Sequence, residues 1–261
     1  MTLKRVVIGL VVLAVIGGAT LFVLDRTIWA PVAVSTGVPV APTLAAAPTQ
    51  PASTAVPTAV ANDPVSTAAP TAAASNPANA AASAQVYRID AAQSEVRYEV
   101  DETFFQGNRL NTAVGRTKGI AGELRVDFAQ PAQSQIGDIV IDISQFTSDE
   151  SRRDNFIRRN NLESATYPQA TFKTTSISGL PDKVAVGDVL KFSMTGDLTI
   201  KQTTKPVTWD VELTVGDQQL QGSASTQILM SDFGVGPLQL PALSTEDEVK
   251  LFFDFVALPT Q

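Results

Sequence analysis

The sequence of 261 residues contains no histidine and no cysteine. Without cysteine the chain has no disulfide framework, no thiolate metal site, no cysteine nucleophile and no lipoprotein anchor. Without histidine, Ser-His and Cys-His catalysis, histidine general acid–base chemistry and nearly all zinc sites are excluded. We therefore expect a protein with no resident metal, no cofactor and no catalytic residues.

Basic residues are also scarce, with 19 Lys and Arg against 26 Asp and Glu, a net charge of −7. This balance argues against nucleic acid as a partner, since phosphate binding requires a basic face. Glu246-Asp247-Glu248 is the one dense acidic run. A carboxylate-based hydrolase is an alternative function, because Asp and Glu are the main acid–base groups that remain. The position of the run, at the start of the last expected strand, favours a solvated loop end, and its spacing does not match an EF-hand.

An apolar run from Val6 to Leu24 follows Lys4 and Arg5. As a helix it would extend roughly 28 Å, close to the thickness of the hydrocarbon core of a bilayer. The run is longer than a typical signal-peptide core, and no small-residue cleavage site follows it. We expect residues 1–29 to form a single-pass membrane anchor with the C-terminal part outside the cytoplasm. The alternative is a cleaved signal peptide and a secreted protein.

Residues 30–85 contain no aromatic side chain and only one charge, Asp63, and prolines recur throughout. This composition prevents helix propagation and offers nothing to seed a core. It predicts a disordered, partly polyproline-II linker that holds the next domain away from the membrane.

From residue 86 to residue 261 the pattern is that of a globular all-β domain. Apolar and polar residues alternate along about eight segments spaced by roughly ten residues, as in an antiparallel barrel or sandwich. The expected strands are residues 96–100, 120–128, 139–143, 170–177, 189–200, 207–211, 220–230 and 249–256. The connection at 102–114 is expected to be irregular or briefly helical.

One short helix is expected after Thr147-Ser148-Asp149-Glu150, which reads as a capping box. Phe156 and Ile157 would give this helix its apolar face. Four arginines (152, 153, 158 and 159) occupy much of the remainder. They favour a solvated face paired with neighbouring acidic residues over an anion-binding site.

The most informative stretch is Thr195–Val211, which predicts a β-hairpin with Trp209 turned inward. Its Gly-x-Leu-Thr-Ile and Thr-Lys-Pro-Val segments resemble the signature hairpin of the YceI-like lipid- or polyisoprenoid-binding family. Further segments resemble the same family in the same order, and the resemblance covers roughly residues 86–258. They are Ser151-Arg152-Arg153-Asp154, Tyr167-Pro168-Gln169-Ala170-Thr171-Phe172 and Ser231-Asp232-Phe233-Gly234.

The resemblance implies an eight-stranded antiparallel lipocalin-like barrel with one inserted helix. It also implies that an isoprenoid or other apolar lipid is held in the barrel interior. Together with strand phase, it suggests that the ligand is lined by Phe128, Ile141, Phe156, Phe172, Phe192, Trp209 and Phe233. Periodicity does not separate ligand lining from ordinary core. A structural or adhesive surface module with a filled barrel is therefore an alternative.

The chain also departs from the family pattern. Gln202 stands where the hairpin usually has glycine, and Met230 where a basic residue usually precedes the Ser-Asp-Phe-Gly segment. A histidine common in relatives is missing near Asp101, and the 102–118 connection is longer than usual. These departures predict an altered head-group preference and leave apolar chain binding less affected.

Overall fold

The computed structural model describes residues 32–44 and 84–260. The predicted membrane helix, Val6–Leu24, lies outside these residues, as does most of the predicted linker. Within the two described ranges, no helix has the length and apolarity needed to cross a membrane.

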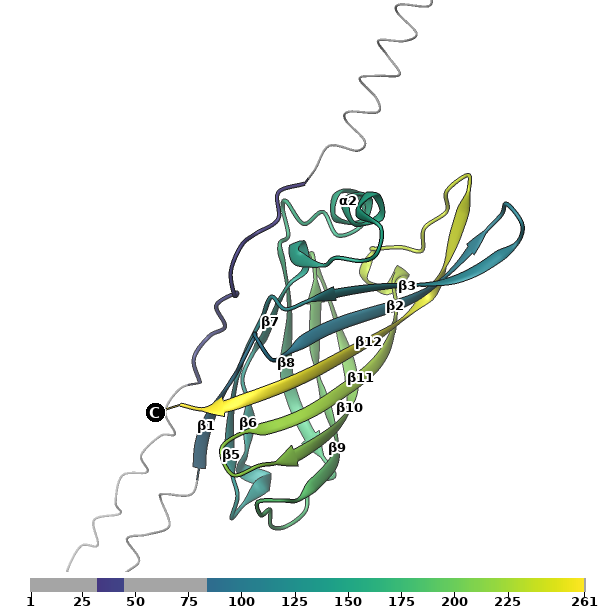
Figure 1. The fold of residues 1–261 in the computed structure, drawn as a ribbon. Coiled ribbons are helices and arrows are strands. Elements are labelled where there is room, and N and C mark those ends of the chain that lie inside the picture. Colours follow the sequence, from purple (N-terminus) through teal and green to yellow (C-terminus); the bar gives the residue numbers. More distant parts are fainter. Residues whose placement is uncertain (1–31, 45–83, 261) are drawn as a thin grey trace, which may run out of the picture.

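The domain is an antiparallel sheet of twelve strands that curls into a barrel, with one α-helix at one end (Figure 1). The strands are β1 (Ala84–Ile89), β2 (Glu95–Phe104), β3 (Arg109–Thr117), β4 (Ile120–Ala121), β5 (Glu123–Asp127), β6 (Gln135–Ile136), β7 (Ile139–Asp142), β8 (Gln169–Ser178), β9 (Val189–Ile200), β10 (Thr203–Val215), β11 (Leu220–Leu229) and β12 (Leu243–Pro259). The helix is α2 (Ser151–Asn160), and three 3-10 turns, η2 (Pro131–Gln133), η3 (Ile143–Gln145) and η4 (Ser231–Phe233), lie in the connections. The prediction of an all-β, antiparallel domain with one helix is confirmed.

The structure has twelve strands where the sequence predicted eight, because β1, β3 and β6 were not predicted and the strand expected at 120–128 is interrupted. β4 and β5 follow each other across Gly122 and pair with β7 and β6 respectively. The long strand β12 pairs with both β1 and β2, which are separated by a turn. The path runs from β4 through β7 to β12, β1, β5 and β6. Because β4 at one end continues across Gly122 into β5 near the other end, the sheet curls round on itself.

The predicted hairpin at 195–211 is present, but it is longer and tighter than expected. β9 and β10 pair from Val189 to Thr214, and only Lys201 and Gln202 lie outside the ladder. Lys201 takes the positive φ of 56° in this turn, and the turn therefore accepts a non-glycine residue at Gln202. Pro206 lies within β10, not before it. It is tolerated there because β10 pairs with β11 only from Asp210 onward.

Three other local predictions are corrected by the structure. The 102–114 connection is a hairpin of β2 and β3, with no helix in it. Ile143 opens the 3-10 turn η3 and is not the end of a strand. The first strand, β1, was not predicted, because its first two residues are exposed and buried and exposed residues alternate only over its last three positions.

The helix α2 is capped one turn later than the sequence suggested. Glu150 is the N-cap, and its carboxylate accepts a hydrogen bond from the Arg152 amide at 3.0 Å. Ser148 instead binds the Asp154 carboxylate through both its amide and its hydroxyl. The expectation of a solvated arginine face is also wrong for Arg158, which is buried and donates to the Phe146 carbonyl at 2.7 Å.

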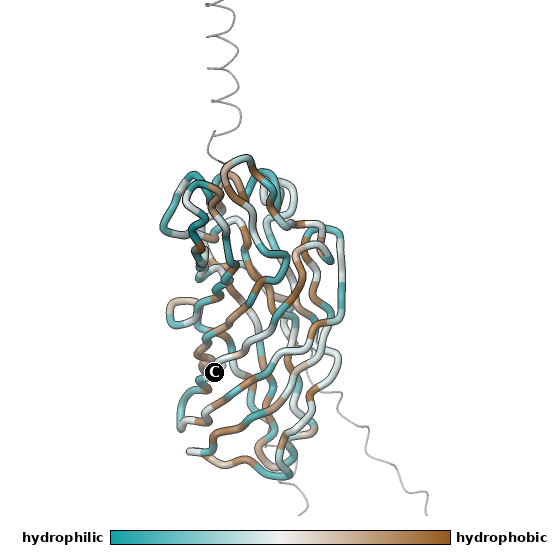
Figure 2. The backbone as a smooth tube through the Cα atoms, turned by 90° about the vertical axis from the view of Figure 1, so that its right-hand side faces the viewer, coloured by the Kyte–Doolittle hydropathy of each residue, from teal (hydrophilic) through white to brown (hydrophobic). Residues whose placement is uncertain are grey.

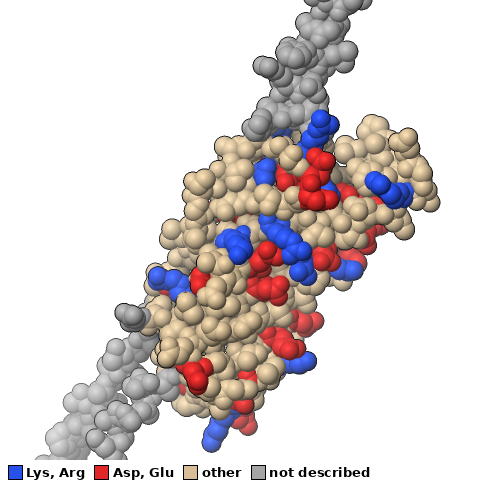
Figure 3. Space-filling view, in the orientation of Figure 1, with Lys and Arg blue, Asp and Glu red and all other residues tan. Residues whose placement is uncertain are grey.

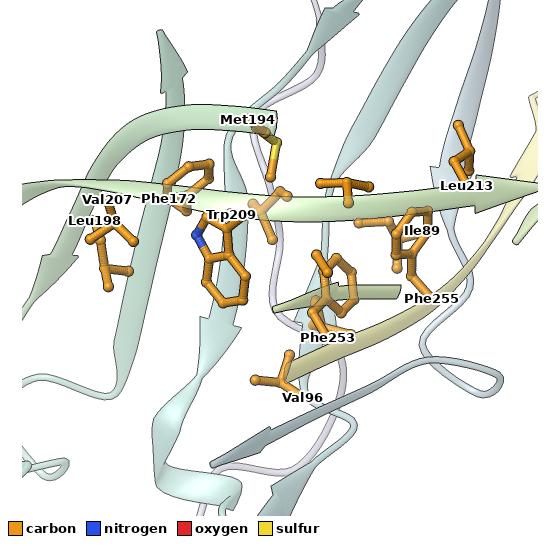
Figure 4. Packing of buried hydrophobic residues seen from close by; sticks show 14 of the residues in the cluster. Ile89, Val96, Phe172, Met194, Leu198, Val207, Trp209, Leu213, Phe253 and Phe255 are labelled. Carbon is orange, nitrogen blue, oxygen red and sulfur yellow. The ribbon is translucent and has the colours of Figure 1, made fainter. Parts of the chain in front are cut away.

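Hydrophobic and hydrophilic residues alternate along the strands (Figure 2). The hydrophobic residues form the core inside the barrel. Near its middle, the Phe172 and Trp209 rings meet edge to face at 6.1 Å between centroids (Figure 4). Phe253 and Phe255 lie beside them, with ring centroids 5.0 Å apart. Trp209 is buried, as predicted.

Residues 32–44, here called the strap, run along the outside of the barrel (Figure 1). At one end, Ser35 binds the side chains of Asp142 and Ser144. At the other, the Leu44 amide donates to Glu123 at 3.0 Å. These residues belong to the segment that the sequence assigned to the linker, and the structure places them on the domain.

Candidate functional site

An apolar cavity of about 120 Å³ lies at the α2 end of the barrel; we call it the helix-end cavity. The strands contribute its side walls, while the loops beside α2 and η4 cover it. Its apolar lining consists of Val100, Ala113, Ile143, Phe146, Ile157, Leu162, Ile200, Ile228, Met230, Val235, Leu238, Val249 and Leu251. Such a lining favours an apolar guest over a charged one.

A few polar groups meet this cavity, namely Tyr98, Glu102, Arg153, Asn161 and Thr245. The Arg153 guanidinium lies 3.6 Å from the buried Glu102 carboxylate. Arg153 Nε is nevertheless buried without a hydrogen-bond partner in the described structure, as is Asn161 Oδ1. Unpaired buried polar atoms are unfavourable by about 1–3 kcal/mol each, so a guest with matching polar atoms would gain by pairing with them.

Tyr98 stands at the cavity wall with its ring pressed against the neighbouring strand. A Cβ added at Gly115 would lie 2.2 Å from the Tyr98 ring, and only glycine allows this approach. Phe146 packs edge-on against the same ring at 5.2 Å. Burial raises the pKa of the Tyr98 hydroxyl to about 12, the carboxylate of Asp154 adds to the effect, and Arg153 opposes it. Tyr98 is therefore a neutral hydroxyl at physiological pH.

The interior does not form one continuous channel. A second cavity of about 40 Å³ lies at the far end, between residues such as Leu190, Phe192 and Val215. Along β12, Leu251 lines the helix-end cavity and Phe253 follows it inward, in the packed layer of aromatic rings. Aromatic side chains therefore fill the barrel between these two cavities, and the helix-end cavity is larger than the far-end cavity.

The seven residues predicted to line the ligand are not gathered in one place. Phe192 lines the far-end cavity, and Phe172 and Trp209 belong to the packed middle layer. The others are dispersed, none of them on the wall of either cavity: Phe128 packs against Tyr87, Ile141 pairs with Ile120, Phe156 lies on α2 and Phe233 in η4. Their contact with a ligand stays a prediction.

Half of the cavity residues that sequence reasoning missed lie outside the strands. Leu162, Val235 and Leu238 are in loops, where periodicity gives no signal. On α2 it is Ile157, the neighbour of the predicted Phe156, that reaches the cavity. Met230, noted for replacing a basic residue, also lines it and makes the wall more apolar than a basic side chain would.

The acidic run at 246–248 has a structural role. It lies inside β12 where the register with β2 shifts, and so bulges from the ladder. Asp247 accepts hydrogen bonds from the amide and hydroxyl of Ser231, and its carbonyl accepts from the Met230 amide at 2.8 Å. This bulge fixes the η4 turn over the cavity. The described ranges contain no cluster of His, Cys, Asp and Glu suited to a metal ion.

These features define a class of protein: a single antiparallel sheet closed into a barrel, with one inserted helix and an apolar cavity beneath it. The sequence profile of the YceI-like domain matches residues 87–257. The chain therefore belongs to the YceI-like family, as its motifs indicated.

Relatives and solved structures agree with this assignment. A UPF0312 protein from Vibrio parahaemolyticus is 28% identical over 166 residues, which are 59% of this chain and 79% of that protein. Protein YceI from Escherichia coli O157:H7 is 30% identical over 128 residues, 46% of this chain and 62% of that protein; the match thus spans less than two thirds of its length.

Two solved structures share the fold. BcnA from Burkholderia cenocepacia is 26% identical with a TM-score of 0.52, covering 64% of this chain and 98% of that chain. A polyisoprenoid-binding domain from Saccharophagus degradans, implicated in plant cell wall breakdown, has a TM-score of 0.50 and covers 67% of this chain and 99% of that domain. At 15% identity the second structure shows the fold alone.

Proposed function

We propose that this protein binds an apolar isoprenoid or similar lipid, of quinone or polyprenyl type, inside its barrel and does not catalyse a reaction. The observation that carries the proposal is the helix-end cavity, whose wall is apolar except for five residues. Membership of the YceI-like family and the ligand of the S. degradans domain support the same class of guest.

The size of the cavity indicates how such a lipid would be held. At about 120 Å³ it is smaller than the roughly 300–1,000 Å³ pockets that enclose whole drug-sized ligands. It therefore accommodates a segment of a chain, and a longer ligand requires side chains to move. Met230 suits that adjustment because methionine is unbranched and flexible. Each methylene buried would contribute about 0.8 kcal/mol before ordering costs.

The polar groups beside the cavity are suited to a head group. The Arg153 Nε–H is an unpaired donor, and the Tyr98 hydroxyl is a second donor, so a carbonyl or phosphate oxygen would match both. Asn161 Oδ1 would accept from a hydroxyl. The head group would then lie near α2, and the apolar chain would point into the barrel.

The membrane anchor and the extracytoplasmic location are further parts of the proposal. The apolar run Val6–Leu24 after Lys4 and Arg5 supports both. A lipid carrier tied to a bilayer would stand beside its source of ligand. Cleavage of the N-terminal segment would instead give a secreted carrier with the same barrel.

One observation favours a second candidate, a surface module with a filled core. The packed layer around Phe172, Trp209 and Phe253 divides the barrel interior. This candidate requires no ligand at all.

Organic extraction of the full-length protein, purified in lipid nanodiscs from a membrane-containing host, separates the two candidates. Nanodiscs containing an unrelated single-span protein provide the background. An isoprenoid or quinone enriched in about equimolar amount over that background is the expected result. No enrichment, even after incubation with quinones and polyprenyl phosphates, would exclude lipid binding and leave the filled module.

A further inference from the structure

A projecting lobe stands beside the helix-end cavity. It consists of residues 103–113, at the tip of the β2–β3 hairpin, and residues 234–244, the loop before β12 (Figure 1). The two segments are joined by the Phe105 amide, which donates to the Ala242 carbonyl at 3.0 Å, and by pairing of Phe104 with Leu243. Val235 and Leu238 belong to the same loop and line the cavity. The lobe is therefore part of the cavity's surroundings.

The surface of the lobe is unusually poor in charge. Its two segments contain one charged residue, Arg109, although 17% of the chain is charged. Figure 3 shows the lobe as a largely uncharged projection carrying one basic side chain. Phe105 is 54% exposed and Leu110 is 78% exposed. Large apolar side chains exposed together at a tip mark a contact surface.

The strap leads the chain to the same end of the barrel. Its first described residues contact the 142–145 segment, where Ser35 meets Ser144 and the Gln145 side-chain Nε2–H donates to the Gly37 carbonyl at 2.7 Å. The adjoining residues Ile143 and Phe146 line the helix-end cavity. In Figure 1 the upper end of the strap, α2 and the lobe all lie at one end of the barrel.

The length of chain before the strap limits how far this end can stand from the anchor. Seven residues separate Leu24, the end of the predicted membrane helix, from Val32. Fully extended, they reach roughly 25 Å. The long linker at 45–83 does not enter this distance, because it follows the strap. The strap thus shortens the tether that composition alone suggested.

We propose that the lobe contacts the surface of the lipid bilayer and turns the helix-end cavity toward it. Phe105 and Leu110 would enter the interfacial region, with Arg109 at the level of the head groups. Burying two such side chains is worth about 3–6 kcal/mol, which is modest for a free protein. A short tether makes it sufficient, since the contact is then intramolecular.

The proposal concerns the orientation of the barrel. It rests on the proposed anchor for the tether and on the proposed function for the choice of a lipid partner. A lipid partner is favoured over a protein partner because the lobe adjoins a cavity proposed for lipid, at the end where the chain leads to the apolar run. Direct passage of the guest between bilayer and barrel would follow from this arrangement.

The absence of cysteine allows a direct test. Full-length Gln106→Cys protein is labelled with a fluorophore and reconstituted in phosphatidylcholine vesicles with and without lipids brominated along their acyl chains. The matched control is Asp217→Cys, in the β10–β11 turn at the far end of the barrel. Quenching at position 106 at least threefold stronger than at 217 is expected. Equal or absent quenching at 106 would overturn the proposal.

Two further variants identify the cause of any quenching. Phe105→Ser with Leu110→Ser, in the Gln106→Cys background, should abolish it. Val186→Ser with Val189→Ser, exposed apolar residues near the far-end cavity, should leave it unchanged. Quenching that needs anionic lipid and disappears in salt would show charge attraction instead, and would overturn apolar insertion. If the label at position 106 is protected from solvent only at high protein density and is not quenched by brominated lipid, a second copy of the protein covers the lobe. That result would also overturn the bilayer contact.

Extraction of the same samples distinguishes this proposal from the proposed function. Quenching at position 106 without any bound isoprenoid would support the orientation and reject lipid binding. Bound isoprenoid without quenching at position 106 would support lipid binding and reject the orientation.

Discussion

At the scale of single residues, several buried polar side-chain atoms in the described structure have no hydrogen-bond partner. The Trp209 indole Nε1–H is one of them: the side chain is 8% exposed, and the donor has no partner in the described structure. The Arg153 Nε–H and Asn161 Oδ1 are others, next to the helix-end cavity. We interpret the latter two as sites for a guest's polar atoms.

Replacing Trp209 by phenylalanine tests whether its donor lacks a partner. Removing an unpaired donor offsets part of the loss of ring packing, so the free energy of unfolding should change by no more than about 1 kcal/mol. Trp209→Ala, which empties the same space, should lower it by about 3–5 kcal/mol. Urea denaturation measures both values. A Phe variant as unstable as the Ala variant would show that the indole N–H has a partner.

Tyr98 predicts a pH dependence of stability. Burial is the main cause that raises the pKa of its hydroxyl from 10.0 in the unfolded chain to about 12 in the fold. A raised pKa gives stability that is full below pH 10 and is lost as the pH rises toward 12. The loss should be roughly 3 kcal/mol, and Tyr98→Phe should remove this part of it. Unfolding measured at pH 9 and 11.5 in both proteins checks this, and an unchanged slope in the variant would contradict it.

At the scale of elements, alternation predicted eight of the strand regions and the inward side of the signature hairpin, but it missed β1, β3 and β6. It failed where short-range pattern does not decide the conformation. The bulge at Glu246–Glu248 depends on Ser231, and the cap of α2 depends on which acidic residue reaches the first amides. The loop residue Leu238 reached the cavity with no periodic signal. These outcomes are set by tertiary contacts.

The strap is the element least visible in the sequence. Its residues are small, apolar or proline, as in any linker, and its partners lie far along the chain: Glu123 is 79 residues from Leu44, and Ser144 is 109 from Ser35. Glu123 and Asp142 are both buried, and such carboxylates require partners. The strap supplies a partner to each of them through Leu44 and Ser35.

The strap should loosen when Ser35 is changed. Ser35→Ala removes the hydrogen bond to Asp142, a bond to a charged group worth about 1.5–3 kcal/mol. Hydrogen exchange at the Leu44 amide should then accelerate at least tenfold, while exchange in β9 and β10 should not change. Thr36→Ala, an exposed neighbour, is the control. Unaltered exchange at Leu44 would mean that the strap does not open as a unit.

Acid should loosen the strap as well. Burial of Asp142 raises the pKa of its carboxyl, but hydrogen bonds from Ser144, Ser35 and Gln145 outweigh this and hold the pKa below 3.8. A lowered pKa gives stability that is present above pH 3.8 and is lost as the pH falls through the folded-state value. Protection of the Leu44 amide should therefore persist at pH 4.5 and decline below pH 3. Equal protection at both values would contradict the role of Asp142.

At the scale of the whole molecule, the account joins a barrel with a cavity at one end, a strap that leads the chain to that end, and an uncharged lobe beside it. The family and the antiparallel barrel with one helix were predictable, because motif order and alternation extend along the chain. The position of the cavity was not. It depends on how far each core side chain fills the interior, and periodicity carries no information on that.

Filling the cavity should remove the guest without unfolding the protein. Val249→Trp places a larger ring in the helix-end cavity and should lower stability by about 1–3 kcal/mol. It should reduce the extracted isoprenoid by at least tenfold. Val184→Trp, beside the far-end cavity, should leave the amount unchanged. Equal loss in both variants would place the guest elsewhere or spread it through the barrel.

The most direct test of the central claim is photo-crosslinking of the full-length protein with an isoprenoid that carries a diazirine near the end of its chain, followed by peptide mapping. The account predicts labels on residues that surround the helix-end cavity from separate elements, such as Ile157, Leu238 and Val249. Competition by an unlabelled isoprenoid should remove them. Labels confined to exposed surface residues such as Val186, and insensitive to competition, would contradict the claim that the barrel holds the lipid.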